Sequence, residues 1–363
     1  MDDDNHAYRD GILAVAPTDA RFMLRVPPRA RLSFSAGLFK ASRPGDTATF
    51  RVVIETKGEA TTVFAREIAA RPDDWHWHDA VVDLEAWAGQ DIRLLLETRA
   101  PSQSRGLAVW GTPLVTSSRR AGDPPNVVVI AVDTLRADRL SAYGYGRRTS
   151  PQIEALAAQG TLFHNAFSAS NWTSPAFASI FTGFMPSKHQ VIHRARAIPS
   201  EMTTLAEYFR RAGWTTHAIV YKAYLYNMGF EQGFDTWFNV PRYDVRADDN
   251  LAKAMAWLDQ YGHSRFFLFL HFNDPHQPFN QPPPFDRVYN TADDLARQGV
   301  SLPIVIEPGG GVRGCGACTA GGVPKPGFEK LAHALYDGAV AYVDDRIGKF
   351  LSALKERALY DKT

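Results

Sequence analysis

The sequence predicts an α/β protein preceded by a smaller all-β part, and two observations carry that prediction. Before residue 119, short segments rich in β-branched and aromatic residues are separated by Gly, Pro and Asp, as in a β-sandwich. After residue 125, continuous apolar runs alternate with amphipathic stretches, the pattern of a mostly parallel sheet covered by helices. We therefore expect a β-sandwich over 1–118, a linker over 119–125 and an α/β domain over 126–363.

The all-β part contains five segments that predict strands. Several of them alternate apolar and polar residues, which is typical of strands with one buried face. No long segment with a period of 3.6 residues interrupts them. They are the segments 31–38, 47–55, 61–68, 91–99 and 106–115.

The α/β part begins with "NVVVIAV", residues 126–132, a run that is apolar throughout, as in a parallel strand buried on both faces. A helix is predicted over 150–160, where Ser150 can cap the start, Pro151 suits the first turn and Gly160 can end it. Further helices are predicted over 202–213, 248–262 and 336–360, and further strands over 216–221 and 265–272.

Composition and charge exclude some classes of function. The chain has 363 residues, of which 45% are hydrophobic, and a net charge of +1. This balance gives no reason to expect binding to nucleic acid. No apolar run approaches the roughly 18 residues that span a bilayer, and the polar start "MDDDNHAYRD" is unlike a secretory signal. Neither the compartment nor the oligomeric state follows from these features.

Polar residues gather after the predicted strands, at the edge where α/β sheets bind ligands. They are Asp133, Thr134 and Arg136 after 126–132, Lys222 after 216–221, and Asn273, Asp274 and His276 after 265–272. Thr173, in "NWTSPAFASIFTG", lies at the start of a further predicted helix. A carboxylate, a hydroxyl, an amine and an imidazole on one rim suit a metal-assisted attack on an anionic ester.

Each of these residues also has a structural interpretation. Asp133 can cap the following turn, and Thr173 can act only as a helix cap. Lys222 can be a solvated surface charge, and His276 can bond a loop carbonyl. The joint occurrence of the four residue types favours the site over the separate explanations.

Three further motifs are weaker. His76 and His78 in "WHWH" share one face of a possible strand, but two histidines without a third ligand are usually not a metal site. Cys315 and Cys318 form a CxxC motif in a glycine-rich segment, where a disulfide or free thiols are favoured over a metal or redox role. Asn171 begins a formal glycosylation sequon, which we interpret as chance because a glycan there would block the proposed site.

Four segments together resemble the sulfatase family of the alkaline phosphatase superfamily over about residues 125–363. They are "PNVVVIAVDTLRADRLSAYGY", "TSPQIEALAAQGTLFHNAFSASNWTSPAFASIFTGFMPSKH", "FLFLHFNDPHQPF" and "YDGAVAYVDDRIGKFLSALKERALYD". The resemblance implies an alkaline-phosphatase-like sheet between layers of helices, a divalent metal ion and a sulfate- or phosphate-ester substrate, on a glycan or linked to glycerophosphate. The all-β part loosely resembles carbohydrate-binding domains fused to such enzymes.

The resemblance also implies roles for single residues. Asp133 matches the first metal ligand, and Thr173 matches the nucleophile, which also contacts the metal. Lys222 and His276 match a lysine and a histidine beside the transferred anion. The residues expected to contact the substrate around them are Arg136, Asn171, Ser174 and Asp274. The expected ion is calcium, manganese or zinc.

Three positions depart from the family pattern. Thr173 stands where sulfatases have a Cys or Ser that becomes formylglycine, a conversion that threonine cannot undergo by that route. Phe177 replaces an arginine, and Thr134 replaces a second aspartate. A threonine nucleophile is similar to that of the phosphoglycerol transferase and phosphodiesterase branches, in which the alkoxide attacks phosphorus directly.

The family pattern continues with an Asp-His pair that ligates the metal, whereas the sequence stops at Thr363. We expect a truncated sequence that binds metal weakly and turns over slowly. The competing hypothesis is a non-catalytic protein in which the all-β part binds carbohydrate and the α/β part is a scaffold. Thr134 and Phe177 support that second hypothesis.

Overall fold

The structure, a computed structural model of the whole chain, describes most of its residues. These are 11–39, 42, 44–71, 76–104, 107–221, 225, 227–239, 246–277, 279, 281–290, 292–297, 300–306, 312–315 and 329–363.

The first part of the chain folds into two antiparallel sheets. Their strands are β1 (Gly11–Val15), β2 (Thr18–Arg25), β3 (Ala30–Leu38), β4 (Thr47–Thr56), β5 (Glu59–Ala69), β6 (His78–Asp83), β7 (Asp91–Arg99) and β8 (Leu107–Ser117). One sheet has the order β1-β8-β3-β6 and the other β2-β7-β4-β5. All five predicted strands are present, and β1, β2 and β6 are additional.

The two antiparallel sheets share a single hydrophobic core, with Trp110 of β8 in it. This side chain is 0% exposed, and its ring lies 5.2 Å from Phe34 of its own sheet and 5.1 Å from Phe50 of the other. Its indole N–H donates to Thr98 Oγ1 of β7 at 2.9 Å. Trp110 therefore joins the sheets through both ring packing and a hydrogen bond.

The second part is built on a parallel sheet with the order β11-β10-β12-β9. Its strands are β9 (Val127–Val132), β10 (Thr215–Val220), β11 (Thr236–Asn239) and β12 (Phe266–Phe272). Every residue of β12, "FFLFLHF", is buried, because helices cover both faces of the sheet. The predicted strands 126–132, 216–221 and 265–272 are confirmed.

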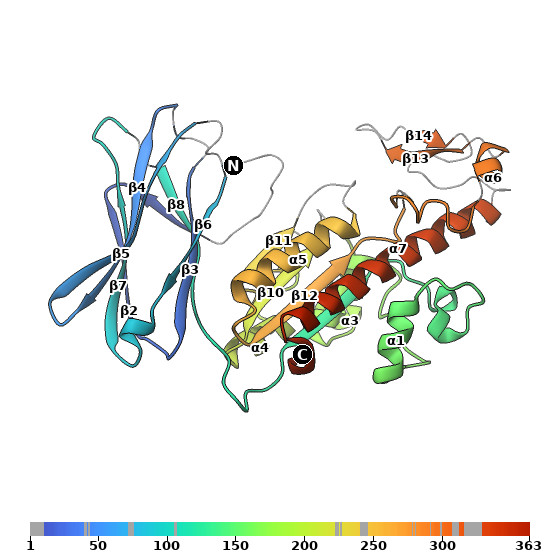
Figure 1. Cartoon of the computed structure of the whole chain (residues 1–363), viewed down its shortest axis with the longest axis horizontal. Coiled ribbons are helices and arrows are strands. Elements are labelled where there is room, and N and C mark those ends of the chain that lie inside the picture. Colours follow the sequence, from blue (N-terminus) through green and yellow to red (C-terminus); the bar gives the residue numbers. More distant parts are fainter. Residues whose placement is uncertain are drawn as a thin grey trace.

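Helices form a layer on each side of this sheet. The helices are α1 (Pro151–Gln159), α2 (Thr173–Thr182), α3 (Pro186–His189), α4 (Leu205–Arg211), α5 (Ala247–Tyr261), α6 (Ala292–Arg297) and α7 (Glu329–Glu356), and a hairpin of β13 (Val300–Ile306) and β14 (Val312–Cys315) precedes α7. Phe266, Leu268 and Leu270 of β12 pack with α5 and α7, and Phe267 and Phe269 pack with α2 and α4. Figure 1 shows α5 and α7 lying across the sheet. Among the described residues, no helix is long and apolar enough to cross a membrane.

The start of α1 is capped differently from the prediction. Ser150 makes no side-chain cap bond; its hydroxyl instead accepts from the Ser141 N–H at 2.8 Å. The carboxylate of Asp344 on α7 accepts from the N–H groups of Gln152 and Ile153 at 3.0 and 2.8 Å. A side chain distant in sequence thus caps α1, which sequence pattern alone does not reveal.

Strand β8 links the two parts of the fold. Leu114 near its end packs against the core that α5, α7 and β12 share. Thr116 Oγ1 lies 3.0 Å from His263 Nε2, and the Arg119 N–H donates to the His263 carbonyl at 3.0 Å. The β-sheets and the α/β layers therefore have direct contacts as well as a covalent connection.

Replacement of Trp110 by alanine is expected to lower the free energy of unfolding by about 3–5 kcal/mol, because it leaves a cavity between the sheets and removes the partner of Thr98. Denaturant unfolding followed by circular dichroism measures the effect. The control is Met23→Ala, whose side chain is 72% exposed on β2 and whose loss should cost no more than about 0.5 kcal/mol. Equal unfolding midpoints for the two variants would contradict the assignment of Trp110 to the core.

Candidate active site

The carboxyl end of β9 forms the first half of the site. Asp133 follows the strand, and its N–H donates to the carbonyl of Phe272, the last residue of β12, at 2.9 Å. Thr134 then adopts a left-handed backbone with φ 54°, which is unfavourable for a threonine. The Tyr336 hydroxyl from α7 donates to the Thr134 carbonyl at 2.8 Å and accepts from the Arg136 N–H at 2.9 Å. The turn that presents Asp133 is therefore held by α7.

Burial raises the pKa of Tyr336 to about 12. The phenol consequently stays protonated near neutral pH and keeps donating to Thr134. The hydrogen bond that stabilises the strained turn is thus independent of pH over the range in which carboxylates and histidines titrate.

Thr173 forms the second half of the site. It is the first residue of α2, and Trp172 before it is extended and provides no side-chain cap. The Thr173 side chain is turned toward the end of β9 instead, where its hydroxyl donates to Asp133 Oδ2 at 3.1 Å. Thr173 is 9% exposed. The carboxylate and the hydroxyl that the sequence predicted to converge therefore do so.

The start of α2 offers further hydrogen-bonding groups. The first N–H groups of a helix have no partner within it and carry partial positive charge, which favours a bound anion. Ser174 Oγ is buried and has no hydrogen-bond partner among the described residues. A buried hydroxyl without a partner is costly, so a ligand that bonds Ser174 would recover that energy.

His271 is a further site residue that the sequence analysis did not single out. It lies within β12, is 0% exposed, and its Nε2 is 3.7 Å from Asp133 Oδ2. The Tyr221 N–H donates to its Nδ1 at 3.4 Å, which leaves Nε2 as the protonated nitrogen facing Asp133. Phe177 of α2 meets the imidazole edge to face at 4.9 Å. The histidine is thus enclosed between the carboxylate and an aromatic ring.

The remaining predicted residues have different positions. Arg136 forms a two-point pair with exposed Asp138, at 2.9 and 2.7 Å. Asn171 is exposed. His276 is half-buried, and its Nδ1 lies 2.6 Å from the Gln277 carbonyl, the loop contact weighed above as its structural interpretation. Lys222 and Cys318 lie outside the described residues.

Asp274 follows β12 in the chain and lies against the start of α5, where the Ala247 N–H bonds its carboxyl. It is 5% exposed, and burial raises the pKa of its carboxyl to about 7, although the N–H groups of Asp274 and Ala247 counter the shift by hydrogen bonding. Its Oδ2 has no partner within the described part of the chain. The structure therefore places Asp274 as a buried carboxyl that contacts the backbone of α5.

Two residues at the site offer oxygen atoms of the kind that a divalent ion binds. Asp133 Oδ2 and Thr173 Oγ1 are two oxygen atoms that lie 3.1 Å apart, and oxygen ligands suit hard divalent cations. In the described ranges no group of three or more His, Cys, Asp or Glu lies together to hold a metal ion, either at this site or at another. His76 and His78 stack at 4.2 Å without forming such a group. Asp133 and Thr173 therefore fit a divalent ion as two of its ligands.

A parallel sheet covered by helices, with a carboxylate and a helix-start hydroxyl at its carboxyl edge, is also found in solved structures of other proteins. Among solved structures, the phosphonate monoester hydrolase of Agrobacterium radiobacter aligns with a TM-score of 0.53 and 23% identity over 66% of this chain and 61% of that one. A putative sulfatase from Bacteroides fragilis aligns with the same TM-score and 19% identity over 68% and 62%. These likenesses confirm the predicted fold class.

The chain belongs to the sulfatase family, whose model, Sulfatase, matches residues 125–363. It is 27% identical over 271 residues to human N-acetylgalactosamine-6-sulfatase, an alignment that covers 67% of this chain and 49% of that protein. It is 24% identical over 298 residues to the arylsulfatase of Clostridium perfringens, covering 66% and 61%. The chain spans about half the length of the curated human relatives that it matches. The predicted family is confirmed.

Asp274→Asn is expected to flatten the pH dependence of stability. Because burial raises the pKa of folded Asp274 from 3.8 to about 7, its contribution is fully present below pH 3.8 and is lost as the pH rises through about 7. Between pH 3.8 and about 7, the carboxyl of Asp274 should therefore lower the unfolding free energy of wild-type protein by about 1.4 kcal/mol for each pH unit. Urea unfolding at a series of pH values measures the difference between variant and wild type. The exposed Asp361→Asn variant is the control, and a slope for Asp274→Asn equal to that of the control would contradict the buried carboxyl.

Proposed function

We propose that this protein is a metal-dependent hydrolase or transferase of sulfate or phosphate esters in which Thr173 is the nucleophile. The observation that carries the proposal is the 3.1 Å hydrogen bond from Thr173 Oγ1 to Asp133 Oδ2 at the first turn of α2. The bond directs the hydroxyl toward the strand edge and gives its proton an acceptor. The start of the helix adds a place for the ester's anionic group.

The reaction begins with attack of Thr173 Oγ on the sulfur or phosphorus of the ester. The new Oγ bond forms as the bond to the leaving alcohol oxygen breaks, and the hydroxyl proton passes to Asp133 or to solvent. A divalent ion bound by Asp133 and Thr173 would lower the pKa of the hydroxyl and offset negative charge. His276 and Lys222 are proposed to protonate the leaving oxygen and to bind the anion. Water then hydrolyses the threonine ester, or an acceptor alcohol takes the group.

His271 and Phe177 are proposed as positioning residues. The imidazole faces Asp133 at 3.7 Å, close enough to favour one orientation of the carboxylate electrostatically. Phe177 packs on the imidazole at 4.9 Å and on Phe269 at 5.5 Å, so it restricts the ring. The side chain that replaces the family's arginine thus supports the carboxylate indirectly instead of binding an anion.

The class of ester is narrowed by Thr173. Threonine cannot give the formylglycine of sulfatases with a Cys or Ser at this position, and direct attack by a hydroxyl is the chemistry of phosphoryl transfer through a phosphorylated side chain. Relatives named as sulfatases keep sulfate esters in the proposal. A panel of sulfate monoesters, phosphate monoesters and phosphodiesters, each with calcium, manganese and zinc in turn, separates these substrates.

A carbohydrate-binding role is proposed for the two antiparallel sheets. We also propose that residues 1–118 and 126–363 are separate domains joined by 119–125. Their buried cores divide accordingly, since one cluster comprises residues from Ala14 to Trp110 and two others comprise residues from Phe177 to Leu359. A separate core is what an appended module requires.

Thr173→Ala is expected to reduce turnover on the order of 10⁴-fold, because a residue that forms the covalent intermediate cannot be replaced by its neighbours. Steady-state hydrolysis of the best ester in the panel measures the loss, and circular dichroism checks the fold. Thr173→Ser, which keeps the hydroxyl, should retain part of the activity.

The matched control is Thr182→Ala at the other end of α2. Among the described residues its hydroxyl bonds the Ala178 carbonyl and the Phe184 N–H, and its loss should leave turnover at the wild-type level. Undiminished turnover by folded Thr173→Ala would overturn the nucleophile. Absence of turnover of every ester by wild-type protein with each metal would instead favour the non-catalytic hypothesis.

A further inference from the structure

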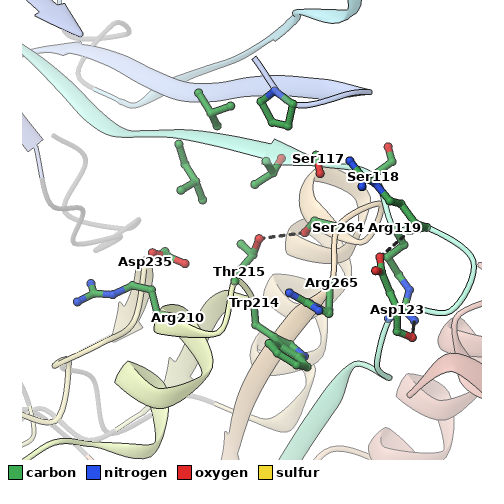
Figure 2. A pocket seen from close by; sticks show the side chains of 16 residues that line it. Ser117, Ser118, Arg119, Asp123, Arg210, Trp214, Thr215, Asp235, Ser264 and Arg265 are labelled. Atoms are coloured by element: carbon green, nitrogen blue, oxygen red, sulfur yellow. Dashed lines mark hydrogen bonds between the residues drawn. The ribbon is translucent and has the colours of Figure 1, made fainter. Parts of the chain in front are cut away.

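A cavity of about 440 Å³ lies between β8 and the amino ends of β10 and β12. Its walls come from the end of β8 and the segment after it, from the end of α4 and the turn into β10, and from the residues that precede β11 and β12, with Pro27 completing the lining. Figure 2 shows the labelled side chains of these segments gathered around it. A volume of this size lies within the range of small-molecule sites.

Arginine dominates the charge of this cavity. The arginines that line it are Arg119, Arg120, Arg210 and Arg265, and the acidic residues are Asp123 and Asp235. Asp123 Oδ2 accepts from the Arg120 N–H at 2.6 Å. Asp235 Oδ2 accepts from the Thr216 N–H and hydroxyl at 2.8 and 3.1 Å. Both carboxylates are thus occupied by backbone or hydroxyl donors, and the guanidinium groups outnumber them.

Two of the arginines are held in place. Arg119 donates to Asn126 Oδ1 at 2.7 Å. Arg265 donates to the Ala212 carbonyl at 2.8 Å, and its guanidinium lies 3.8 Å over the ring of Trp214. Arg265 Nε is buried without a hydrogen-bond partner in the described part of the chain. This fixed guanidinium retains a donor that a ligand can satisfy.

The other two arginines are available to a ligand. Arg120 and Arg210 are exposed side chains, and no described residue accepts a hydrogen bond from either guanidinium. Arg210 lies beside Asp235 at one side of the cavity (Figure 2) and interacts with it electrostatically. Guanidinium groups bind planar or tetrahedral oxyanions through two parallel N–H donors, so they are suited to sulfate and carboxylate.

We propose that this cavity is a second anion-binding site that takes the sulfate group of a sulfated monosaccharide unit. The arginines bind the oxyanion. Trp214 carries Arg265 on its ring face, and the buried hydroxyls of Ser264 and Thr215 bond each other at 3.1 Å, so these three residues support the arginines instead of contacting the sugar. The choice of a sulfated sugar over other oxyanions rests on the proposed function, whereas the arginine site itself rests on the cavity.

The cavity is separate from the Thr173 site. Thr215 and Arg265 stand at the amino ends of β10 and β12, and Asp133 stands beyond the carboxyl end of β9. Because β12 has 7 residues, the two sites are roughly 20 Å apart along the strands. A single sulfated monosaccharide therefore occupies one site or the other, and a longer chain could carry separate groups to each.

The test is calorimetric titration at constant ionic strength with N-acetylgalactosamine 6-sulfate, N-acetylgalactosamine and inorganic sulfate. A Thr173→Ala background prevents turnover during the titration. Arg120→Ala/Arg210→Ala should weaken binding of the sulfated sugar at this site by about tenfold or more, since two charge-assisted contacts are lost. The matched control is Arg211→Ala, an exposed neighbour on α4 that pairs with Glu207 and does not line the cavity. It should bind as the background protein does.

The outcomes separate the alternatives. Equal binding by the double variant and the control would overturn the proposal, because all binding would then belong to the Thr173 site. If N-acetylgalactosamine bound as tightly as its 6-sulfate, the sulfate group would have no role in binding, which would overturn the anion site. If inorganic sulfate bound as tightly as the sulfated sugar, the site would hold an adventitious ion only. A protein that hydrolyses no ester would overturn the proposed function without affecting this titration, which measures binding alone.

Discussion

The parallel pairing of β9 with β12 is the constraint on which the site depends. Its register sets Ala131 beside His271 and Val132 beside Phe272, and the ladder ends where the Asp133 N–H bonds the Phe272 carbonyl. A slip of one residue would turn every side chain of β9 to the opposite face. Because Val127, Val129 and Ala131 pack on one core and Val128, Ile130 and Val132 on the other, apolar side chains would still fill both cores. The slip would, however, break the bond from the Asp133 N–H to the Phe272 carbonyl and take the carboxylate away from the imidazole. The end of the ladder therefore fixes the geometry of the polar edge.

Aromatic packing positions the candidate nucleophile. Phe177 and Phe181 of α2 contact Phe269 of β12 at 5.5 and 4.8 Å, and each buried ring contributes about 1.5–3 kcal/mol. These contacts hold the helix so that Thr173 at its start meets the end of β9. An arginine in place of Phe177 would put a charge into this apolar contact, at a cost unless an anion paired with it. The departure from the family pattern is thus consistent with a helix held by packing.

The sequence predicted those parts of the fold and site that local pattern determines. Apolar runs identified the parallel strands, and a strand end and a helix start predicted that Asp133 and Thr173 lie together, as they do at 3.1 Å. The sequence did not predict His271, because one polar residue within an apolar strand has no periodic signal. Its closeness to Asp133 follows only from the pairing register of β12 with β9. Asp274 was grouped with the site because it follows a strand, but the position of α5, which depends on tertiary packing, sets its environment. The arginine cavity joins several segments distant in sequence and has no local signature.

The two ends of the parallel sheet carry opposite chemistry. The carboxyl edge collects oxygen donors, Asp133 and Thr173, next to a helix start, and it is the edge where we propose that a cation and an anionic group bind together. The amino edge collects guanidinium groups where β8 meets the α/β layers, and we propose that it binds anions alone. Contacts such as Thr116 with His263 hold β8 against this edge, so the cavity exists only while the two parts stay docked.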